Sequence, residues 1–422
     1  MKKTTGKALV ASILLVCVCF ASTSCLLSFG SMSGQLTKEE VQQMIDNGMN
    51  GNVTVNGGDS YDITINAGNA DNALAAKSLL STVSIDCVFK SMSLYPSSFG
   101  GIVSEKIGSG SGVIYKLDKE KGDAYIITNY HVVYYNRNNT SNGISNDITV
   151  YLYGQEDKAY AIPAKYVGGS MTYDLAVLKV EGSRVLAESN AIAAEFADSN
   201  NVAVLDKAVA VGNPEDFGIS ATLGYINVDS EYIEIEGADG TTEIEVRVMR
   251  IDTAVNSGNS GGGLYDASGR LIGIVNAKYA DSENMGYAIP SNVVKYIADN
   301  ILYYCDGKDN ENVVRSQIGI NVDAKALYTV YDTETGKVHK REVVSITKVD
   351  SKSLANGKLK VGDVINSITI DGVTYEVNRM FVVSECLFNA RVGSVVSINI
   401  TRDGTEKTVD ITITESVLTK VK

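Results

Sequence analysis

Short runs rich in Val, Ile and Tyr recur from about residue 79 to residue 289, and Gly and Asn separate them. Strand-and-turn spacing over roughly 200 residues, with almost no helical periodicity, predicts an all-β sandwich or barrel. The clearest predicted strands are Gly112–Tyr115, Tyr125–Thr128, Ile148–Leu152, Leu175–Val180, Ala208–Val211 and Tyr232–Ile235.

A helix and then a second compact unit follow this β-rich region. Pro290 starts the helix Ser291–Tyr304, whose apolar residues fall on one face. Residues 306–312 form a charged linker that contains glycine. Residues 313–418 mix strands and helix over about 100 residues, enough for one small domain. We therefore predict a β-rich domain at 76–305 and a smaller α/β domain at 313–418.

The N-terminus has the pattern of a targeting segment. Three lysines within the first seven residues precede the apolar run Ala8–Ala21, which predicts a signal peptide or anchor over residues 1–25. Two interpretations stay open. In one the chain is cleaved before Cys25 and lipidated there; in the other the segment is an uncleaved membrane anchor. Both predict an exported, tethered protein.

Residues 26–75 are rich in Asn, Gly, Asp and Ser, a composition that predicts a spacer. The fragments 52–56 and 62–66 alternate like strands within it, but no partner strand is evident nearby.

Charge and cysteine content exclude several classes of function. The 422 residues carry a net charge of −13 without a basic block in the mature region, which argues against a nucleic-acid partner. Cys87, Cys305 and Cys386 are scattered, so we predict buried free thiols, with neither a disulfide framework nor a metal site. No cofactor motif is evident, and we expect no cofactor.

Three short stretches carry candidate catalytic residues. Ser260 lies in the Gly-rich turn Val255–Leu264 between two predicted strands, a composition that ordinary surface turns also have. His131 directly follows a strand, whereas His339, in a polar stretch, is predicted to be a solvated loop residue. Asp174 opens an apolar strand, where a carboxylate can orient an imidazole. Their order, His–Asp–Ser, is the order of the chymotrypsin-like double barrel.

The residues around these three positions resemble the catalytic motifs of the HtrA/Deg family of exported serine proteases. The matching stretches are Thr128–Val132, Asp174–Lys179 and Gly258–Gly262, supported by Gly108–Val113, Val211–Pro214 and Gly286–Asn292. The resemblance extends from about Leu79 to Glu415, and Leu359–Ile365 is similar to a strand motif of the family's PDZ domain. It implies a mainly β chain, with a chymotrypsin-like double β-barrel protease domain followed by a small PDZ-like domain.

The resemblance also implies roles for individual residues. Ser260 would be the nucleophile, His131 the general base and Asp174 its orienter. The oxyanion hole would be formed at Gly258, Asn259 and Ser260, through the amides of the first and last. The predicted specificity pocket is lined by Ala254, Val255, Asn256, Asn276, Ala277 and Lys278. The predicted peptide-binding loop of the PDZ-like domain is formed by Gln317, Ile318, Gly319 and Ile320.

Partners and location are implied in the same way. The expected partners are unfolded polypeptides and peptide C-termini, and the family resemblance implies a homotrimer. The expected location is the outer face of a bacterial cytoplasmic membrane, through the N-terminus, with secretion as the alternative. A binding-only chaperone or scaffold and a structural surface lipoprotein are the rival interpretations. Gly263 and Ser257 stand where the family usually or often has proline, and neither departure removes a catalytic group.

Overall fold

A computed structural model describes residues 52–56, 62–66, 70–92, 103–278, 285–308 and 310–421. The chain divides into two compact units, Met1–Asn72 and Ala73–Lys422. In the first unit, β1 (Asn52–Asn56) pairs antiparallel with β2 (Asp62–Asn66). The expectation that these two fragments lack a partner is therefore wrong, because each is the other's partner. The targeting segment at 1–25 lies outside the described residues.

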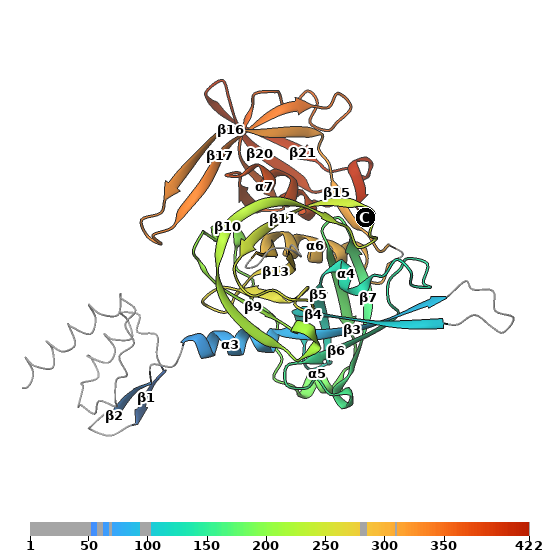
Figure 1. Ribbon diagram of the computed structural model, residues 1–422. Helices are drawn as coiled ribbons and strands as arrows, with labels where there is room; N and C mark the ends of the chain where they lie inside the picture. Colours follow the sequence, from blue (N-terminus) through green and yellow to red (C-terminus); the bar gives the residue numbers. More distant parts are fainter. Residues whose placement is uncertain are drawn as a thin grey trace, which may run out of the picture. The chain divides into compact units, whose positions relative to one another are not determined.

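The first β-barrel carries the predicted histidine and aspartate. It is closed in the strand order β3-β4-β5-β8-β7-β6 (Figure 1). Alternation along these strands sends Val, Ile and Leu side chains into the barrel, as in the buried residues of β8. The strands are β3 (Thr82–Met92), β4 (Val103–Asp118), β5 (Asp123–Thr128), β6 (Asp147–Leu152), β7 (Ile162–Ser170) and β8 (Leu175–Val180).

The second β-barrel carries the predicted nucleophile. Its strand order is β10-β11-β14-β13-β12-β9, and all neighbouring strands are antiparallel. The prediction of a mainly β fold with a double barrel is confirmed. The strands are β9 (Lys207–Gly212), β10 (Ser220–Glu236), β11 (Glu243–Ile251), β12 (Gly263–Tyr265), β13 (Leu271–Lys278) and β14 (Gly286–Pro290).

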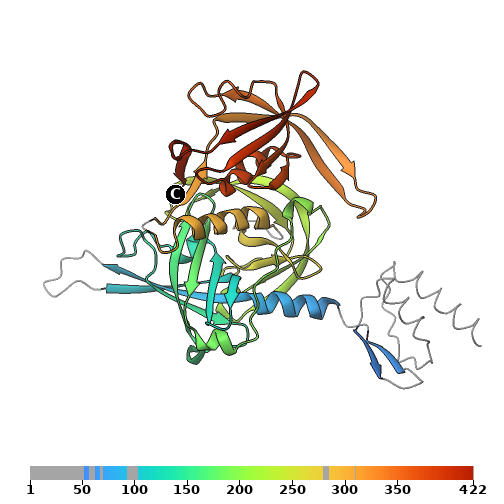
Figure 2. The same ribbon diagram turned by 180° about the vertical axis from the view of Figure 1, so that it is seen from behind.

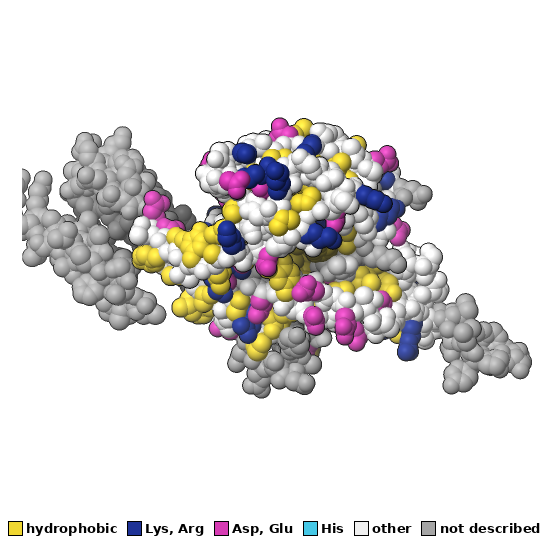
Figure 3. All heavy atoms as spheres, turned by 90° about the horizontal axis from the view of Figure 1, so that it is seen from above, with side chains coloured by type: hydrophobic (Ala, Val, Ile, Leu, Met, Phe, Trp, Pro, Cys, Tyr) yellow, Lys and Arg dark blue, Asp and Glu magenta, His cyan; other side chains and the backbone are white. Residues whose placement is uncertain are grey.

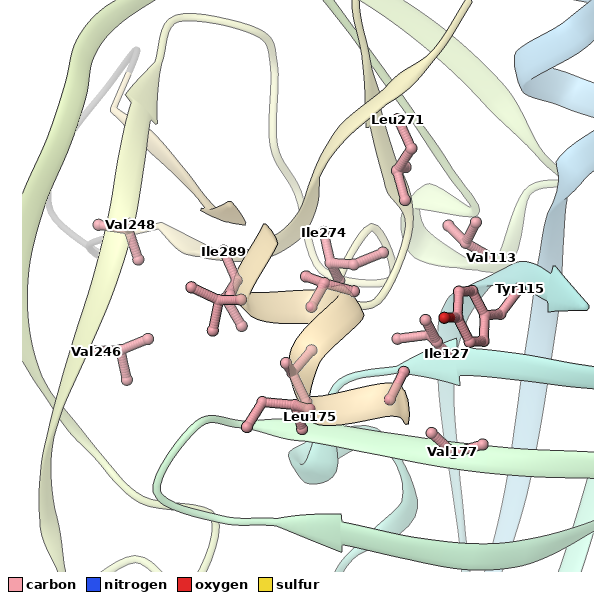
Figure 4. Close-up of a cluster of buried hydrophobic side chains, with 14 of the residues drawn as sticks. Val113, Tyr115, Ile127, Leu175, Val177, Val246, Val248, Leu271, Ile274 and Ile289 are labelled. Atoms are coloured by element: carbon pink, nitrogen blue, oxygen red, sulfur yellow. The ribbon is translucent and has the colours of Figure 1, made fainter. Parts of the chain in front are cut away.

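The two barrels share one hydrophobic core. Figure 4 shows Val113, Ile127 and Val177 of the first barrel near Leu271 and Ile274 of the second. The helix α6 (Ser291–Tyr304) contributes its buried apolar face to the same cluster and lies across the barrels (Figure 2). The sequence predicted this helix with the same bounds. Because the core is shared, residues on opposite barrels are held at a fixed separation.

The helix α3 (Ala70–Ser81) leads into β3. It crosses residue 75, where we expected the spacer to end. Its last residue, Ser81, and Thr82 each place a hydroxyl 2.9 Å from the hydroxyl of Tyr265, which is fully buried in the second barrel. The start of the first barrel is thereby tied to β12.

Residues 313–421, called here the C-terminal unit, lie within the second compact unit and form a sheet covered by a short helix. Its strand order is β16-β17-β18-β20-β21, and β19 pairs with β18. A separate pair, β15 (Val313–Ser316) with β22 (Leu418–Val421), closes the chain back onto the linker. The elements are β16 (Ile320–Tyr331), β17 (Val338–Val349), β18 (Val364–Ile370), β19 (Val373–Glu376), α7 (Met380–Glu385), the 3-10 helix η4 (Cys386–Asn389), β20 (Val395–Arg402) and β21 (Thr405–Thr412).

Polar contacts hold the C-terminal unit against the second barrel. Arg247 of β11 donates two hydrogen bonds to Glu385 of α7, at 2.5 and 2.8 Å, and both side chains are buried. Lys337, between β16 and β17, lies 2.7 Å from Asp206 of the barrel. His339 is consequently only 8% exposed and lies in β17, so the prediction of a solvated loop histidine is wrong.

The cysteines and the helices of the described residues bear on two of the predictions. Cys87, Cys305 and Cys386 are free and buried, as predicted. No helix in the described part of the chain is long and apolar enough to cross a membrane.

Candidate active site

His131 is presented by a one-turn helix at the end of β5. This helix, α4 (Tyr130–Val133), buries Val132 and Val133 in the first barrel and leaves the imidazole at its surface. The side chain of His131 is 37% exposed. Burial of two adjacent valines fixes the direction of the turn, and thereby the position of the histidine.

Asp174 holds the imidazole in one orientation. Its Oδ2 lies 2.7 Å from His131 Nδ1, and its Oδ1 accepts the backbone amide of His131 at 3.0 Å. Because a carboxylate only accepts hydrogen bonds, Nδ1 carries the proton and Nε2 is left as the basic nitrogen. Burial disfavours the imidazolium, but the charge and hydrogen bond of Asp174 outweigh it and raise the pKa of His131 above its ordinary value.

The backbone around Asp174 is unusual and well supported. Asp174 has a φ of +47°, a left-handed conformation that is uncommon outside glycine. Its amide donates to Met171 at 3.1 Å, and its carbonyl accepts from the Asn129 side chain at 2.8 Å. Asn129, two residues before His131, thus fixes the turn that carries the carboxylate.

Ser260 follows a tight turn. The amide of Asn259 donates to the carbonyl of Asn256 at 3.0 Å, and Gly258 has a φ of +94°, as the third position of a type II turn requires. The Asn259 amide is therefore engaged, which removes it from the predicted oxyanion hole. Within the described residues, the amides of Gly258 and Ser260 have no hydrogen-bond acceptor.

Ser111 of β4 joins this turn to the first barrel. Its hydroxyl donates to the carbonyl of Gly258 at 2.7 Å and accepts the amide of Asn213 at 2.8 Å. Its amide donates to the carbonyl of Ser260 at 2.9 Å, and its carbonyl accepts the hydroxyl of Thr128 at 2.7 Å. Thr128 ends the strand that leads to His131, so one buried serine connects both halves of the site. From the sequence alone, Ser111 is predicted only to be part of a glycine-rich strand.

Asn276 of β13 links Asp174 and Ser260. Its side-chain amide donates to Asp174 Oδ2 at 2.7 Å, and its backbone carbonyl accepts the hydroxyl of Ser260 at 3.0 Å. The side chain is 1% exposed. Its side chain is therefore engaged with the carboxylate and is not free to line the predicted specificity pocket.

The other predicted pocket residues have different fates. Val255 is 7% exposed and packs in the core of the second barrel, so its side chain is not free to line a pocket as predicted. Ala254 and Asn256 are exposed. The side chains of Ala277 and Lys278 lie outside the described part of the structure. The pocket formed by these residues stays a prediction.

Gly263, the departure from the usual proline, has a steric reason. A side-chain carbon at this position would collide with the ring of Tyr265. The Tyr265 hydroxyl is held by Ser81 and Thr82, as described above, so the ring cannot easily move away. Glycine at 263 and tyrosine at 265 therefore form one packing arrangement close in sequence to Ser260.

The predicted peptide-binding loop borders a groove. Gly319 has a φ of +81°, and the amides of Ile318 and Gly319 have no acceptor among the described residues. A cavity of about 560 Å³ lies between this loop, the start of β16, α7 and two residues of the second barrel. Its lining includes Ile318, Ile320, Val322, Phe381, Leu387 and Tyr232.

In the described ranges, no group of three or more His, Cys, Asp or Glu side chains could hold a metal ion.

Comparisons with known proteins place this site in a family. The trypsin-like peptidase domain family matches residues 110–274, which contain His131, Asp174 and Ser260. The serine protease Do-like HtrB of Bacillus subtilis is 34% identical over 72% of this chain and 62% of its own length. The serine protease Do-like HtrA of Lactococcus lactis is 30% identical over 73% of this chain and 71% of its own length. The chain belongs to the HtrA family of serine proteases.

The enzyme class of this HtrA-family chain is serine endopeptidase. The periplasmic serine endoprotease DegP of Escherichia coli is 29% identical over 75% of this chain and 59% of its own length. Among solved structures, the HtrA-type protease AlgW with a decapeptide covers 82% of this chain and 98% of its own, with 24% identity and a TM-score of 0.48. The matched part of the chain spans less than two thirds of HtrB and of DegP.

Proposed function

We propose that this chain hydrolyses peptide bonds in unfolded exported proteins through an acyl-enzyme on Ser260. The observation that carries the proposal is the orientation of His131. Asp174 holds its protonated Nδ1 at 2.7 Å, which leaves Nε2 to accept a proton. An isolated histidine lacks this fixed tautomer, so the pair supports general-base catalysis rather than a structural role.

In the first step, the hydroxyl of Ser260 leaves the carbonyl of Asn276 and gives its proton to His131 Nε2, while Oγ forms a bond to the substrate carbonyl carbon. The negative charge on the carbonyl oxygen is accepted by the amides of Gly258 and Ser260, which have no acceptor in the described residues. Each such donor lowers the barrier by roughly 3–4 kcal/mol in related systems.

In the second step, the peptide C–N bond breaks and the leaving nitrogen takes the proton from His131. Water then gives a proton to His131 and attacks the acyl carbon, which releases the new carboxylate and restores the Ser260 hydroxyl. Asp174 accepts the hydrogen bond from His131 Nδ1 in both steps and stabilises the imidazolium. Asn276 acts as a positioning residue, because its amide donates to the same carboxylate oxygen as the imidazole.

The substrate preference that we propose is a small aliphatic residue before the cut, such as Val or Ala. Ala254 and Asn256, the exposed residues of the predicted pocket, carry no charge. The predicted pocket residues include no carboxylate that could bind a basic side chain.

We further propose that the C-terminal unit acts as a PDZ-like module. A free C-terminal carboxylate would bind the amides of Ile318 and Gly319, and the peptide would lie beside β16 in the groove. Tethering of the protein to the outer face of a bacterial membrane and assembly into a homotrimer are parts of the same proposal. Both rest on the N-terminal pattern and on family membership.

The test is proteolysis of a reduced, denatured protein with mapping of the products by mass spectrometry. We expect cuts after Val, Ala and similar residues by the wild-type protein and none by Ser260→Ala. Cuts clustered after Arg or Lys would overturn the proposed specificity. Equal cleavage by Ser260→Ala would overturn the proposed nucleophile, and binding without cleavage by the wild type would favour the binding-only alternative.

A further inference from the structure

The strand β16 extends far beyond the groove as part of a long hairpin with β17. It is the end strand of its sheet, and it pairs with β17 from Ile320 to Tyr331. Every residue of β16 after Ala324 is exposed. The hairpin arm carries exposed apolar side chains, which Figure 3 shows gathered along it. These are Leu327 (66% exposed), Tyr328 (50%), Val330 (39%), Tyr331 (63%) and Val338 (56%).

An exposed end strand of this kind tends to pair with other chains unless something covers it. End strands present unpaired backbone amides and carbonyls, and soluble proteins usually blunt them with short length, charge or proline. Over Ala326–Tyr331 the edge of β16 has neither a charged residue nor a proline. Apart from Thr329, the residues on both faces of this stretch are apolar or aromatic, so a partner could bind by backbone pairing and by side-chain contacts together.

The exposed edge continues directly from the peptide groove. Ile320, Asn321 and Val322 line the cavity of about 560 Å³, and the same strand then runs on to Tyr331. A chain whose carboxylate sits at the loop before β16 must run antiparallel to it, with its upstream residues beside the distal part of the strand. Twelve residues of extended chain cover about 40 Å, the length of β16.

A bulge at Lys325 divides the edge into two segments. The pairing with β17 shifts by one residue between Ala324 and Ala326, so Lys325 has no partner of its own. The segment before it lines the groove together with residues of α7. The segment after it, Ala326–Tyr331, pairs with β17 residue by residue, and its other edge has no partner strand among the described residues.

We propose that β16 binds a long unfolded C-terminal tail along the whole length of the strand. The strand then contacts upstream apolar residues of the tail as well as its terminal residues. The ligand is an extended polypeptide of about twelve residues with a free carboxylate and with aliphatic or aromatic side chains upstream of its last four or five residues. These upstream side chains contact Leu327, Tyr328 and Tyr331. The inference rests on the proposed PDZ-like role of the groove and extends it to the class of ligand.

The test is fluorescence anisotropy with the Ser260→Ala protein, which cannot cleave the probes. Three labelled peptides share the same four C-terminal residues ending in Val. One has only those four, one adds eight upstream residues that alternate Val and Tyr with Ser, and one adds eight residues of Gly and Ser. We expect the apolar twelve-residue peptide to bind at least about ten-fold more tightly than the other two.

Two variants test whether the higher affinity for the long apolar peptide comes from the distal part of β16. Leu327→Ser combined with Tyr331→Ser should remove the advantage of the long apolar peptide and leave the affinity for the four-residue peptide unchanged. Val392→Ser, at a residue 57% exposed and away from β16, is the matched control and should change neither. Thermal unfolding of all variants checks that the folds are equivalent.

The outcomes separate this inference from the proposed function on which it rests. Equal affinity for the short and long peptides overturns the role of the distal edge and leaves the groove intact. No binding of any peptide overturns the PDZ-like role itself. Sedimentation of the wild type as an oligomer that Leu327→Ser and Tyr331→Ser dissociate, with no gain for the long peptide, would show that a second copy covers the edge.

Discussion

The two barrels contribute halves of the site that differ in how they are held. In the first barrel, the imidazole of His131 and the carboxylate of Asp174 already contact each other at 2.7 Å, and three further hydrogen bonds support that turn. In the second barrel, the hydroxyl of Ser260 donates to the backbone carbonyl of Asn276. The amides beside it, at Gly258 and Ser260, have no acceptor among the described residues.

The difference means that the first barrel holds its half of the site already in the arrangement that catalysis would need, whereas the half on the second barrel must still change a hydrogen bond. His131 and Asp174, the proposed base and its orienter, need no rearrangement before a proton moves, because the tautomer is already fixed. Ser260, the proposed nucleophile, must exchange one hydrogen bond, and the unpaired amides beside it are suited to a charge that exists only after attack. Ser111 and Asn276 are the two residues that connect the halves, so they decide how closely the halves act as one site.

The largest effect is expected for the nucleophile. Replacement of Ser260 by Ala removes the atom that bonds to the substrate, and kcat should fall by roughly 10⁶-fold. Hydrolysis of a quenched fluorescent peptide measures the loss. Ser268→Ala, at an exposed serine in a turn of the same barrel, is the control and should retain wild-type activity. Comparable activity in both variants would remove Ser260 from the site.

The next effect concerns the orienter. Asp174→Asn keeps the shape of the side chain but loses the charge and can place an N–H group toward His131 Nδ1, which favours the wrong tautomer. We expect a loss of roughly 10⁴-fold in kcat at neutral pH with an unchanged thermal unfolding temperature. A loss below ten-fold in the same peptide assay would mean that the His131–Asp174 contact is structural only.

A smaller effect is expected where the halves are joined. Ser111→Ala leaves the carbonyl of Gly258 and the amide of Asn213 without a partner, at a cost of about 1–3 kcal/mol. The nucleophile turn should loosen, and kcat/KM should fall by roughly 5- to 100-fold. Ser109→Ala, two residues earlier on the same strand, is the matched control. If the two variants behave alike, the halves do not depend on this connection.

The smallest effect is a change in pH dependence. His131 must be neutral to accept a proton, so kcat/KM should fall on acidification through a pKa that Asp174 has raised above the ordinary histidine value. Asn276→Ala removes a donor from Asp174 Oδ2, which leaves more negative charge to stabilise the imidazolium. The acid limb should move to higher pH by less than about one unit. Asn276→Thr, which restores a donor, should move it back; a shift toward lower pH in the alanine variant would contradict the assignment.

The sequence identified the three candidate catalytic residues because their positions have local patterns. His131 follows an apolar strand, Asp174 opens one, and Ser260 lies in a glycine-rich turn between two, so each is recognisable within about ten residues. The helix Ser291–Tyr304 was predicted with the observed bounds for the same reason: its apolar face is a local periodicity.

The supporting residues could not be predicted, because their roles depend on contacts between distant segments. Ser111 reaches Gly258 across 147 positions of sequence, and Asn276 reaches Asp174 across 102. The polar neighbours of His339 in the sequence predict a loop residue. In the structure it is buried beside residues of the second barrel. The reason for glycine at 263 lies in the ring of Tyr265, whose hydroxyl is fixed from α3 and β3.

The most direct test of the account is labelling with a fluorophosphonate probe, with the modified residue identified by mass spectrometry. The probe reacts with a serine whose proton a neighbouring base can accept. For the wild-type protein, tested alone and with unfolded protein and a C-terminal peptide, the account predicts a single adduct on Ser260. His131→Ala should abolish it. An adduct on another residue, or one on Ser260 that persists in His131→Ala, would contradict the claim that the two barrels form one catalytic site.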